Sequence, residues 1–385
     1  MLGRLAFGAL FLAAFWLVNE YVPWPYMDEI FHVPQTLQYI SERDFSTWDP
    51  KITTPPGLYY LGFVSSFVTG KGLASLRSVN LAALFVLLVT QPLEVASFPL
   101  LAFYANLYYT DVWSTLLVLA AFSRKNPADW KATSLFFASL WFRQTNVIWL
   151  GLAAAFSILE PYTVRDLTRF SVLQNCAKSA FTVVSPLVYV VGAFCVAFLK
   201  INGGITLGDK TNHQVAIHGA QLLYFLLFLG VFSAPLAVKW VLRQGLRRLY
   251  LVPLELAVIL YIVRCGTIVH PFILADNRHY TFYIWRRVIT PLNGLAVTPV
   301  YWAAWRWFAS TLRFERATTW VFLGAVIAVL VPTPLMEPRY YIVPYLVWRR
   351  FMYKQRASAL ELCWNAMILA ATVAVFCFSE THFMW

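Results

Sequence analysis

Two adjacent carboxylates follow the first hydrophobic stretch of this chain, and they are the residues best suited to do chemistry. Asp28 and Glu29 lie within Pro25–His32, a stretch too polar for a bilayer and too aromatic for an ordinary solvated linker. A carboxylate in such a loop can act as a general base toward a hydroxyl. Acids in a first helical turn also stabilise the helix dipole, and from the pattern alone this structural role is as well supported as catalysis. His32, one turn after Asp28, can face the same cleft.

Two further stretches combine charged and hydrogen-bonding residues. Arg278 and His279 lie in an aromatic-rich stretch, His270–Arg287, and their side chains are suited to holding a phosphate. Lys210 lies in a glycine-rich stretch, Gly203–His213, whose spacing matches neither a Walker loop nor a Rossmann fingerprint.

Two arginines interrupt apolar runs. Arg143 and Arg339 stand where polar groups are costly, and such residues usually face a cavity or each other. For both, a role in a site or cavity is favoured over a purely structural pair. The five cysteines show no CxxC or metal-ligand spacing, so no metal site is predicted.

The elements that position these residues are membrane helices. Hydrophobic residues make up 60% of the 385 residues and charged residues only 12%, which indicates an integral membrane protein. We expect a single polytopic domain over residues 1–385 with about 11–13 membrane segments. They lie near 2–18, 57–70, 77–93, 98–122, 131–142, 146–158, 180–199, 218–238, 251–269, 288–305, 317–333, 340–348 and 358–378.

The net charge of +12 follows from orientation and needs no nucleic acid. About twenty of the thirty basic residues, Arg4, Lys71 and Arg77 among them, fall on one side of the alternating topology. That side is cytosolic by the positive-inside rule, as is the N-terminus. The first lumenal loop, residues 20–57, is then expected to carry the catalytic acid on the opposite face.

Lumenal acids, phosphate binders and a polytopic body together fit glycosyl transfer from a lipid-phosphate donor. At this point the sequence resembles a known family, the α-1,2-glucosyltransferases of the endoplasmic reticulum that use dolichyl phosphate glucose. The strings that carry the resemblance are PYMDEIFHVPQ, WDPKITTPPGLYYL, WFRQTNVIW, INGGITLGDKTNH, ILADNRHYTFYIWRR, LMEPRYYIVPY and the final HFMW.

The resemblance implies an all-α GT-C-type membrane glycosyltransferase of the endoplasmic reticulum. The donor would be dolichyl phosphate β-D-glucose and the acceptor the diglucosylated dolichol-diphosphate oligosaccharide, for protein N-glycosylation. A β-linked donor that gives an α-linked product means inversion by a single displacement with one carboxylate base. No cofactor or metal is expected.

Family position assigns the base to Asp28, with Glu29 as the immediate rival. Adjacent residues on a helix point about 100° apart, so both cannot face one hydroxyl. Arg278 and His279 are the first candidates for the donor phosphate, followed by Arg339 and Arg143. The remaining substrate-binding candidates are His32, Trp48, Asp49 and Lys210, with Trp48 and Asp49 on the acceptor side.

Two alternatives from other classes stay open at this point. A transporter would line its route with buried polar residues, but it usually shows internal repeats and mid-span polar groups, and neither is clear here. A regulatory membrane protein is the other alternative.

Overall fold

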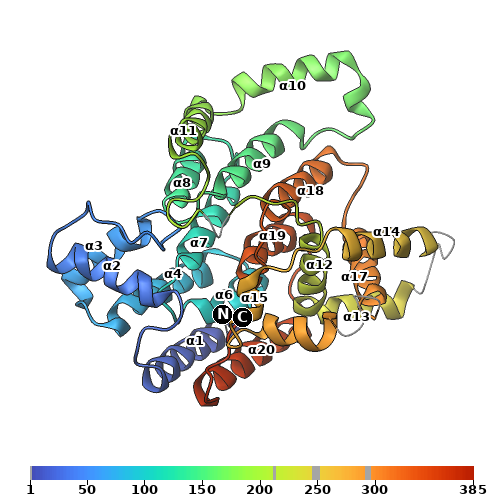
Figure 1. Cartoon of the computed structure of the whole chain (residues 1–385). Coiled ribbons are helices and arrows are strands. Elements are labelled where there is room, and N and C mark those ends of the chain that lie inside the picture. Colours follow the sequence, from blue (N-terminus) through green and yellow to red (C-terminus); the bar gives the residue numbers. More distant parts are fainter. Residues whose placement is uncertain (1, 211–213, 245–251, 291–295) are drawn as a thin grey trace. The chain divides into compact units, whose positions relative to one another are not determined.

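The computed structural model describes residues 2–210, 214–244, 252–290 and 296–385 (Figure 1). These ranges are helical, and the only β contacts within them are two isolated bridges. Two predicted segments, 251–269 and 288–305, and the glycine-rich stretch that ends at His213 include residues outside the described ranges.

The chain forms two compact units, and each is described by itself. Unit 1 comprises Met1–Pro92, Leu101–Asn212 and Phe314–Ala325; unit 2 comprises Leu93–Leu100, His213–Arg313 and Val326–Trp385. The helices of unit 1 are α1 (Leu2–Tyr21), α2 (Glu29–Ser41), α3 (Gly57–Thr69), α4 (Leu73–Thr90), α7 (Asp111–Phe122), α8 (Trp130–Leu140), α9 (Asn146–Leu159), α10 (Phe170–Thr182) and α11 (Pro186–Asn202).

Unit 2 contains shorter and more irregular helices. They are α5 (Leu93–Ala96), α12 (Gln221–Phe232), α13 (Ala234–Gln244), α14 (Val252–Cys265), α15 (Pro271–Ala275), α16 (Tyr280–Ile284), α17 (Thr298–Thr311), α19 (Ile342–Val347) and α20 (Ala359–Phe378). Helices α6 (Pro99–Tyr104) and α18 (Ala317–Leu330) contribute residues to both units.

Helices α1 and α4 run antiparallel, and their contacts define the two ends of unit 1. The Arg4 side chain donates to the Gln91 carbonyl at 2.9 Å, and Arg77 donates to the side chain of Asn19 at 3.3 Å. The start of α1 therefore lies beside the end of α4, and the end of α1 lies beside the start of α4. We call these the Arg4 end and the Asp28 end, since Asp28 follows the last residues of α1.

The predicted second span, 57–70, is wrong. It is helix α3, which has 13 residues and packs against α2 on the Asp28 end. A membrane span needs roughly 20 residues, and α4 already starts at the Asp28 end, so α3 does not cross. Lys71 and Arg77 consequently lie at the Asp28 end and not with Arg4. Burial explains the apolar residues Leu58 and Tyr59 in the first turns of α3, whereas Val64, Phe67 and Val68 in its second half are exposed.

A second error compensates for the first. Residues 98–122 were predicted as one span, but Asn80 donates to the carbonyls of Leu107 and Tyr109, both at 2.7 Å, at the Asp28 end. From there α7 returns to the Arg4 end, where the Ser123 hydroxyl donates to the Gln91 side chain at 3.3 Å. Residues 98–122 thus run from the Arg4 end to the Asp28 end and return to the Arg4 end. The later helices of unit 1 therefore keep their predicted directions.

Few helices have the length of a full span. Within the described ranges, α1, α4 and α20 are long and apolar enough to cross a membrane. The number rises to five only if each of two bent helix pairs, α10 with α11 and α12 with α13, is counted as one span. Several predicted segments are shorter apolar helices, namely α7, α9 and α18. The predicted all-α polytopic membrane fold is confirmed, whereas most of its segments fall short of full spans.

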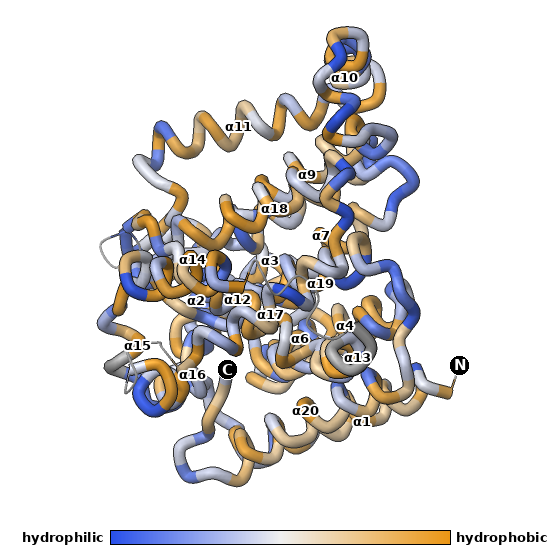
Figure 2. The backbone as a smooth tube through the Cα atoms, turned by 90° about the vertical axis from the view of Figure 1, so that its right-hand side faces the viewer, coloured by the Kyte–Doolittle hydropathy of each residue, from blue (hydrophilic) through white to orange (hydrophobic). Residues whose placement is uncertain are grey.

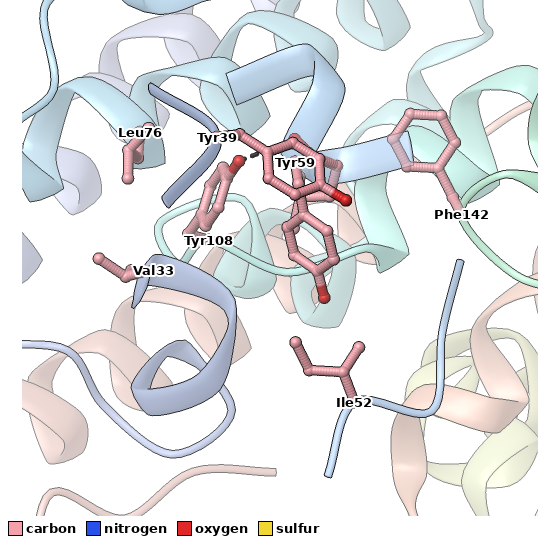
Figure 3. Close-up of a cluster of buried hydrophobic side chains, with 8 residues drawn as sticks. Val33, Tyr39, Ile52, Tyr59, Leu76, Tyr108 and Phe142 are labelled. Atoms are coloured by element: carbon pink, nitrogen blue, oxygen red, sulfur yellow. Dashed lines mark hydrogen bonds between the residues drawn. The ribbon is translucent and has the colours of Figure 1, made fainter. Parts of the chain in front are cut away.

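A buried cluster supports the Asp28 end (Figure 3). It joins α2, α3, α4 and the turn before α7, and three tyrosines, Tyr39, Tyr59 and Tyr108, lie at its centre. The Tyr108 hydroxyl donates to the Leu58 carbonyl at 2.7 Å, which satisfies a buried polar group at the core of the cluster. This cluster fixes the helical pair α2–α3 to the helices of unit 1 at the Asp28 end.

Candidate active site at the Asp28 end

Asp28 lies at the turn that opens α2. The preceding residue, Met27, has φ 53°, a left-handed conformation that is uncommon for a side chain of this type and that often marks functional turns. Asp28 is half-buried, and its amide donates to the Tyr109 hydroxyl at 3.1 Å. Its side chain makes no cap hydrogen bond to α2, so the carboxylate does not serve as a helix cap.

Glu29 has a structural environment that differs sharply from that of its neighbour. Its carboxylate is fully buried and accepts from Arg77 Nε at 2.9 Å and Nη2 at 2.6 Å. It also accepts from the backbone amides of Tyr26 at 3.0 Å and Tyr108 at 2.6 Å. Four donors occupy the two carboxylate oxygens, as the bidentate geometry of an arginine pair favours. Of the two adjacent acids, the structure places Glu29 in the packing and Asp28 at the surface of the site.

Arg77 connects the same ion pair to the end of α1. Its Nη1 donates to the Val22 carbonyl at 2.8 Å and its Nη2 to the Trp24 carbonyl at 3.1 Å. Arg77 is not among the candidate residues that the sequence predicts. The misplaced span assigned Arg77 to the opposite side, and no local signal in the sequence indicates its pairing with Glu29.

His32 and Tyr59 form a buried hydrogen-bonded pair beside Asp28. His32 Nδ1 lies 2.7 Å from the Tyr59 hydroxyl. Burial raises the pKa of the Tyr59 phenol well above its ordinary value, and the Asp28 carboxylate adds to this increase. Tyr59 is therefore a neutral hydroxyl within electrostatic range of Asp28. The Trp48 ring packs against Tyr59 with ring centres 5.6 Å apart, so Trp48 also belongs to this end of unit 1.

The loop after Trp48 docks against the rest of unit 1 through close backbone contacts. The Asp49 amide donates to the Gln35 side chain at 2.9 Å. The Gly57 amide donates to the Trp141 carbonyl at 2.8 Å, and a Cβ on Gly57 would lie 2.4 Å from that oxygen. Only glycine allows this approach.

The glycine-rich stretch after α11 reaches the same loop. A Cβ on Gly208 would lie 2.2 Å from the Ile52 carbonyl oxygen, so the two backbones are in direct contact. The Leu207 amide donates to the Thr53 carbonyl at 3.4 Å. Lys210 is exposed, and its ammonium donates to the Asn202 carbonyl.

Arg143 is ion-paired at this end as well. Its guanidinium contacts Asp111 at 2.6 Å, with 16% of the Arg143 side chain and 3% of the Asp111 side chain exposed. The next residue, Gln144, donates to the Thr53 carbonyl at 2.8 Å. Arg143 therefore lies near the loop that follows Trp48.

Arg278, His279 and Arg339 belong to unit 2, whose position relative to Asp28 is not described. Arg278 forms a fork with Asp276, with Nε at 2.9 Å and Nη2 at 2.7 Å. Burial acts to raise the pKa of Asp276, but the hydrogen bonds and charge of Arg278 outweigh it and the pKa is lowered. The Arg339 guanidinium pairs with Glu337.

The last residues of the sequence contact the Arg278–His279 segment through backbone hydrogen bonds, which residue types alone do not predict. The Met384 amide donates to the Arg278 carbonyl at 2.9 Å, and the Tyr280 amide donates to the Met384 carbonyl at 2.9 Å. His279 Nδ1 lies 3.1 Å from the Trp385 carbonyl. A carbonyl only accepts, so Nδ1 carries the hydrogen and Nε2 donates only when the ring is an imidazolium.

Two of the quoted strings thus meet in space, the ADNRHY stretch and the final HFMW. Within the described ranges no group of three or more His, Cys, Asp or Glu residues is placed to hold a metal ion. Independence of metal stays a prediction.

The helical membrane body, with a half-buried carboxylate in a docked loop at one end, is consistent with a polytopic membrane glycosyltransferase. Comparison with known proteins specifies this class. A model of the DIE2/ALG10 family matches residues 22–350, and the chain belongs to this family.

Among its relatives is a protein of Debaryomyces hansenii, 34% identical over 96% of this chain and 94% of the relative. The Arabidopsis thaliana relative is 32% identical over 90% of each chain, and the Homo sapiens relative 29% identical over 94% of this chain and 91% of the relative. All three are named Dol-P-Glc:Glc(2)Man(9)GlcNAc(2)-PP-Dol alpha-1,2-glucosyltransferase. None of the solved structures matches this chain. The relatives give no support to the transporter or regulatory alternatives.

Proposed function

We propose that this protein transfers glucose from dolichyl phosphate glucose to the diglucosylated oligosaccharide on dolichol diphosphate, forming an α-1,2 linkage. The names of the relatives carry the choice of donor and acceptor. The reaction inverts a β-linked donor in a single displacement. One carboxylate takes the proton of the acceptor hydroxyl while the dolichyl phosphate leaves.

Asp28 is that base, and the contrast with Glu29 is the observation that supports it most. Glu29 is fully buried, and four donors occupy its oxygens. An acceptor hydroxyl could reach it only by displacing Arg77 or a backbone amide. Asp28 is half-buried, does not cap its helix, and lies beside the His32–Tyr59 pair. The strain at Met27 and the packing of Glu29 hold the Asp28 backbone in place.

The donor phosphate is assigned to Arg278 and His279, with Arg339 and Arg143 as further candidates. Each of the three arginines is already oriented by an acid, which fixes the planar guanidinium. The Arg278 side chain is 41% exposed, the most accessible of the three. His279 is fixed by its Nδ1 contact, so its Nε2 would contribute to phosphate binding as an imidazolium.

The active site faces the lumen of the endoplasmic reticulum, and the N-terminus faces the cytosol. Basic residues gather at the Arg4 end of unit 1, in the α7–α8 turn and around α10, namely Arg124, Lys125, Lys131, Arg165, Arg169 and Lys178. The positive-inside rule assigns that end to the cytosol. Lys71 and Arg77, predicted on the cytosolic side, lie at the Asp28 end instead, and Arg77 is paired there with buried Glu29.

Glucose transfer by the purified protein tests the proposal directly. Synthetic dolichyl phosphate glucose and diglucosylated lipid-linked oligosaccharide would be supplied, and Asp28→Asn compared with the wild type. We expect turnover to be lost while donor binding stays intact, because the amide cannot accept the proton. Glu42→Gln neutralises an exposed acid of the same loop and should retain activity. Full activity of Asp28→Asn would refute the assignment of the base, and a strong loss with chelator would refute independence of metal.

A further inference from the structure

Helix α10 is amphipathic and carries an apolar face that no other part of unit 1 covers. Phe170, Leu173 and Phe181 recur at helical spacing, and their exposed fractions are 73%, 48% and 81%. Ser171, Asn175 and Lys178 lie on a different face of the helix. Among the residues of α10 only Val172 is buried. The helix thus has three sides, one packed on protein, one polar and one apolar and open.

The position of α10 relative to the crossing helices follows from contacts at both ends of α11. At the Arg4 end, the Ser185 amide donates to the Ala128 carbonyl at 2.9 Å, and Asn126 donates to the Val183 carbonyl at 2.9 Å. The Ser157 hydroxyl donates to Asn126 at 2.8 Å, which ties the end of α9 to the same place.

At its other end α11 leads to the Asp28 end, where residue 207 contacts residue 53. Helix α11 therefore crosses unit 1 from one end to the other. Helix α10 is bent from α11 by 85° (Figure 2). A helix at a right angle to a membrane-crossing helix lies parallel to the membrane surface.

The apolar face of α10 points to the inside of this bend. Tyr189, in the first turn of α11, stacks on Phe181 with ring centres 6.3 Å apart and an interplanar angle of 25°. Its hydroxyl donates to the Ala180 carbonyl. The side of α10 that holds Ala180 and Phe181 is thus turned toward α11, the direction in which the hydrocarbon of the bilayer lies. An in-plane helix buries its apolar face in this direction.

Basic residues surround α10 in the sequence. Arg165 and Arg169 precede the helix, and Lys178 lies on it. Exposed Trp130, 62% accessible with Lys131 Nζ 5.3 Å from its ring centre, has the character of an interfacial anchor. The nearby acids Asp129 and Asp166 each pair with one arginine at 3.5 Å. The net charge around α10 stays positive because basic residues outnumber these acids.

We propose that α10 lies in the plane of the membrane, in the leaflet opposite Asp28, and binds anionic phospholipid. Its apolar face enters the boundary between headgroups and acyl chains. Arg165, Arg169 and Lys178 contact the phosphates and acidic headgroups, to which basic side chains are attracted near a surface. This surface is separate from the proposed transfer reaction, which takes place at the other end of unit 1.

Spin labels on the full chain in nanodiscs test the placement. Single cysteines at Leu173 and Ala177 are compared with single cysteines at Ser171 and Asn175, after replacement of the five native cysteines. All four positions are exposed in unit 1, so protein packing does not distinguish them. We expect labels at the first pair to be several-fold more accessible to oxygen than to a water-soluble nickel complex, and the reverse at the second pair. Equal nickel access at both pairs, or protection of the first pair from both reagents by a protein partner, would overturn the proposal.

A lipid exchange tests the anionic contact. Thermal inactivation is measured in nanodiscs of phosphatidylcholine alone and with phosphatidylserine added. We expect a gain with phosphatidylserine in the wild type and a reduced gain when Arg165, Arg169 and Lys178 are all replaced by glutamine. Lys71→Gln, a change of one exposed base at the Asp28 end, is the control and should keep the full gain. An unchanged gain in the triple variant would refute the headgroup contact.

Discussion

Removal of Arg77 should disable the site without any contact to substrate. In the wild type, Arg77 and Glu29 are both fully buried, joined by two hydrogen bonds of 2.9 and 2.6 Å. Arg77→Met leaves the Glu29 charge without its partner and removes the donors to the Val22 and Trp24 carbonyls. Breaking a buried pair on one side costs about 3–5 kcal/mol.

That cost falls on the loop that holds Asp28. If it is expressed as opening of the loop, the population of the ordered site falls by roughly two to three and a half powers of ten relative to the open form. We expect slow glucose transfer by Arg77→Met and faster amide hydrogen exchange in residues 22–32. Arg77→Lys keeps the charge but not the planar fork, so its loss should be intermediate.

The double variant gives the control. Glu29→Gln with Arg77→Met removes both charges, and a buried pair is often close to neutral when both partners are replaced. We therefore expect the double variant to lose less than the sum of the two single variants, by more than about 1 kcal/mol. Near wild-type activity and exchange in Arg77→Met, or strict additivity in the cycle, would refute the reasoning.

Three further predictions concern the loops. Gly208→Ala should weaken the docking of its loop by about 1–3 kcal/mol, because the new Cβ meets the Ile52 carbonyl; increased proteolysis there would show it, and an unchanged pattern would contradict it. Met384→Pro removes the amide that donates to the Arg278 carbonyl and should raise the KM for donor without raising the KM for acceptor; equal effects on both would argue against a role at the donor. The pKa of Asp276 is lowered below its ordinary 3.8, so its pair with Arg278 is intact above that pH and is lost as the pH falls through the lowered value; titration of Asp276 should therefore not change donor affinity between pH 8 and about 5, and Asp276→Asn should weaken donor binding throughout that range.

The sequence selected residues that the structure brings together at the Asp28 end, but it did not predict the path of the chain to them. Asp28 and His32 were selected from residue types in an aromatic loop, and the structure places them together at one end of unit 1. Hydrophobicity alone could not distinguish α3 from a span, because apolar residues buried against another helix look the same as those that face lipid. The contact between Glu29 and Arg77, 48 residues apart, decides the matter and leaves no local signal.

The unequal roles of the two adjacent acids also lay beyond the sequence. Spacing shows that Asp28 and Glu29 point in different directions, but it does not show which direction holds an arginine. The same applies to the final HFMW string, whose pairing with Arg278 is made by backbone groups that any residue type offers. Polar residue types indicate which residues are candidates, whereas contacts between residues distant in the sequence determine the environment of each candidate.

The docking of the loop after Trp48 has a consequence for the order of synthesis. The Gly57 amide donates to the Trp141 carbonyl, and the Thr53 carbonyl accepts from the Leu207 amide. Leu207 is synthesised 150 residues after Gly57. At typical synthesis rates this delay is roughly 8 to 30 s. In the proposed orientation, the loop with Asp28 has by then crossed the membrane but lacks the backbone partners that hold it. The nascent site must wait for the end of α11, so a lumenal chaperone that shields aromatic loops would find its substrate in this interval.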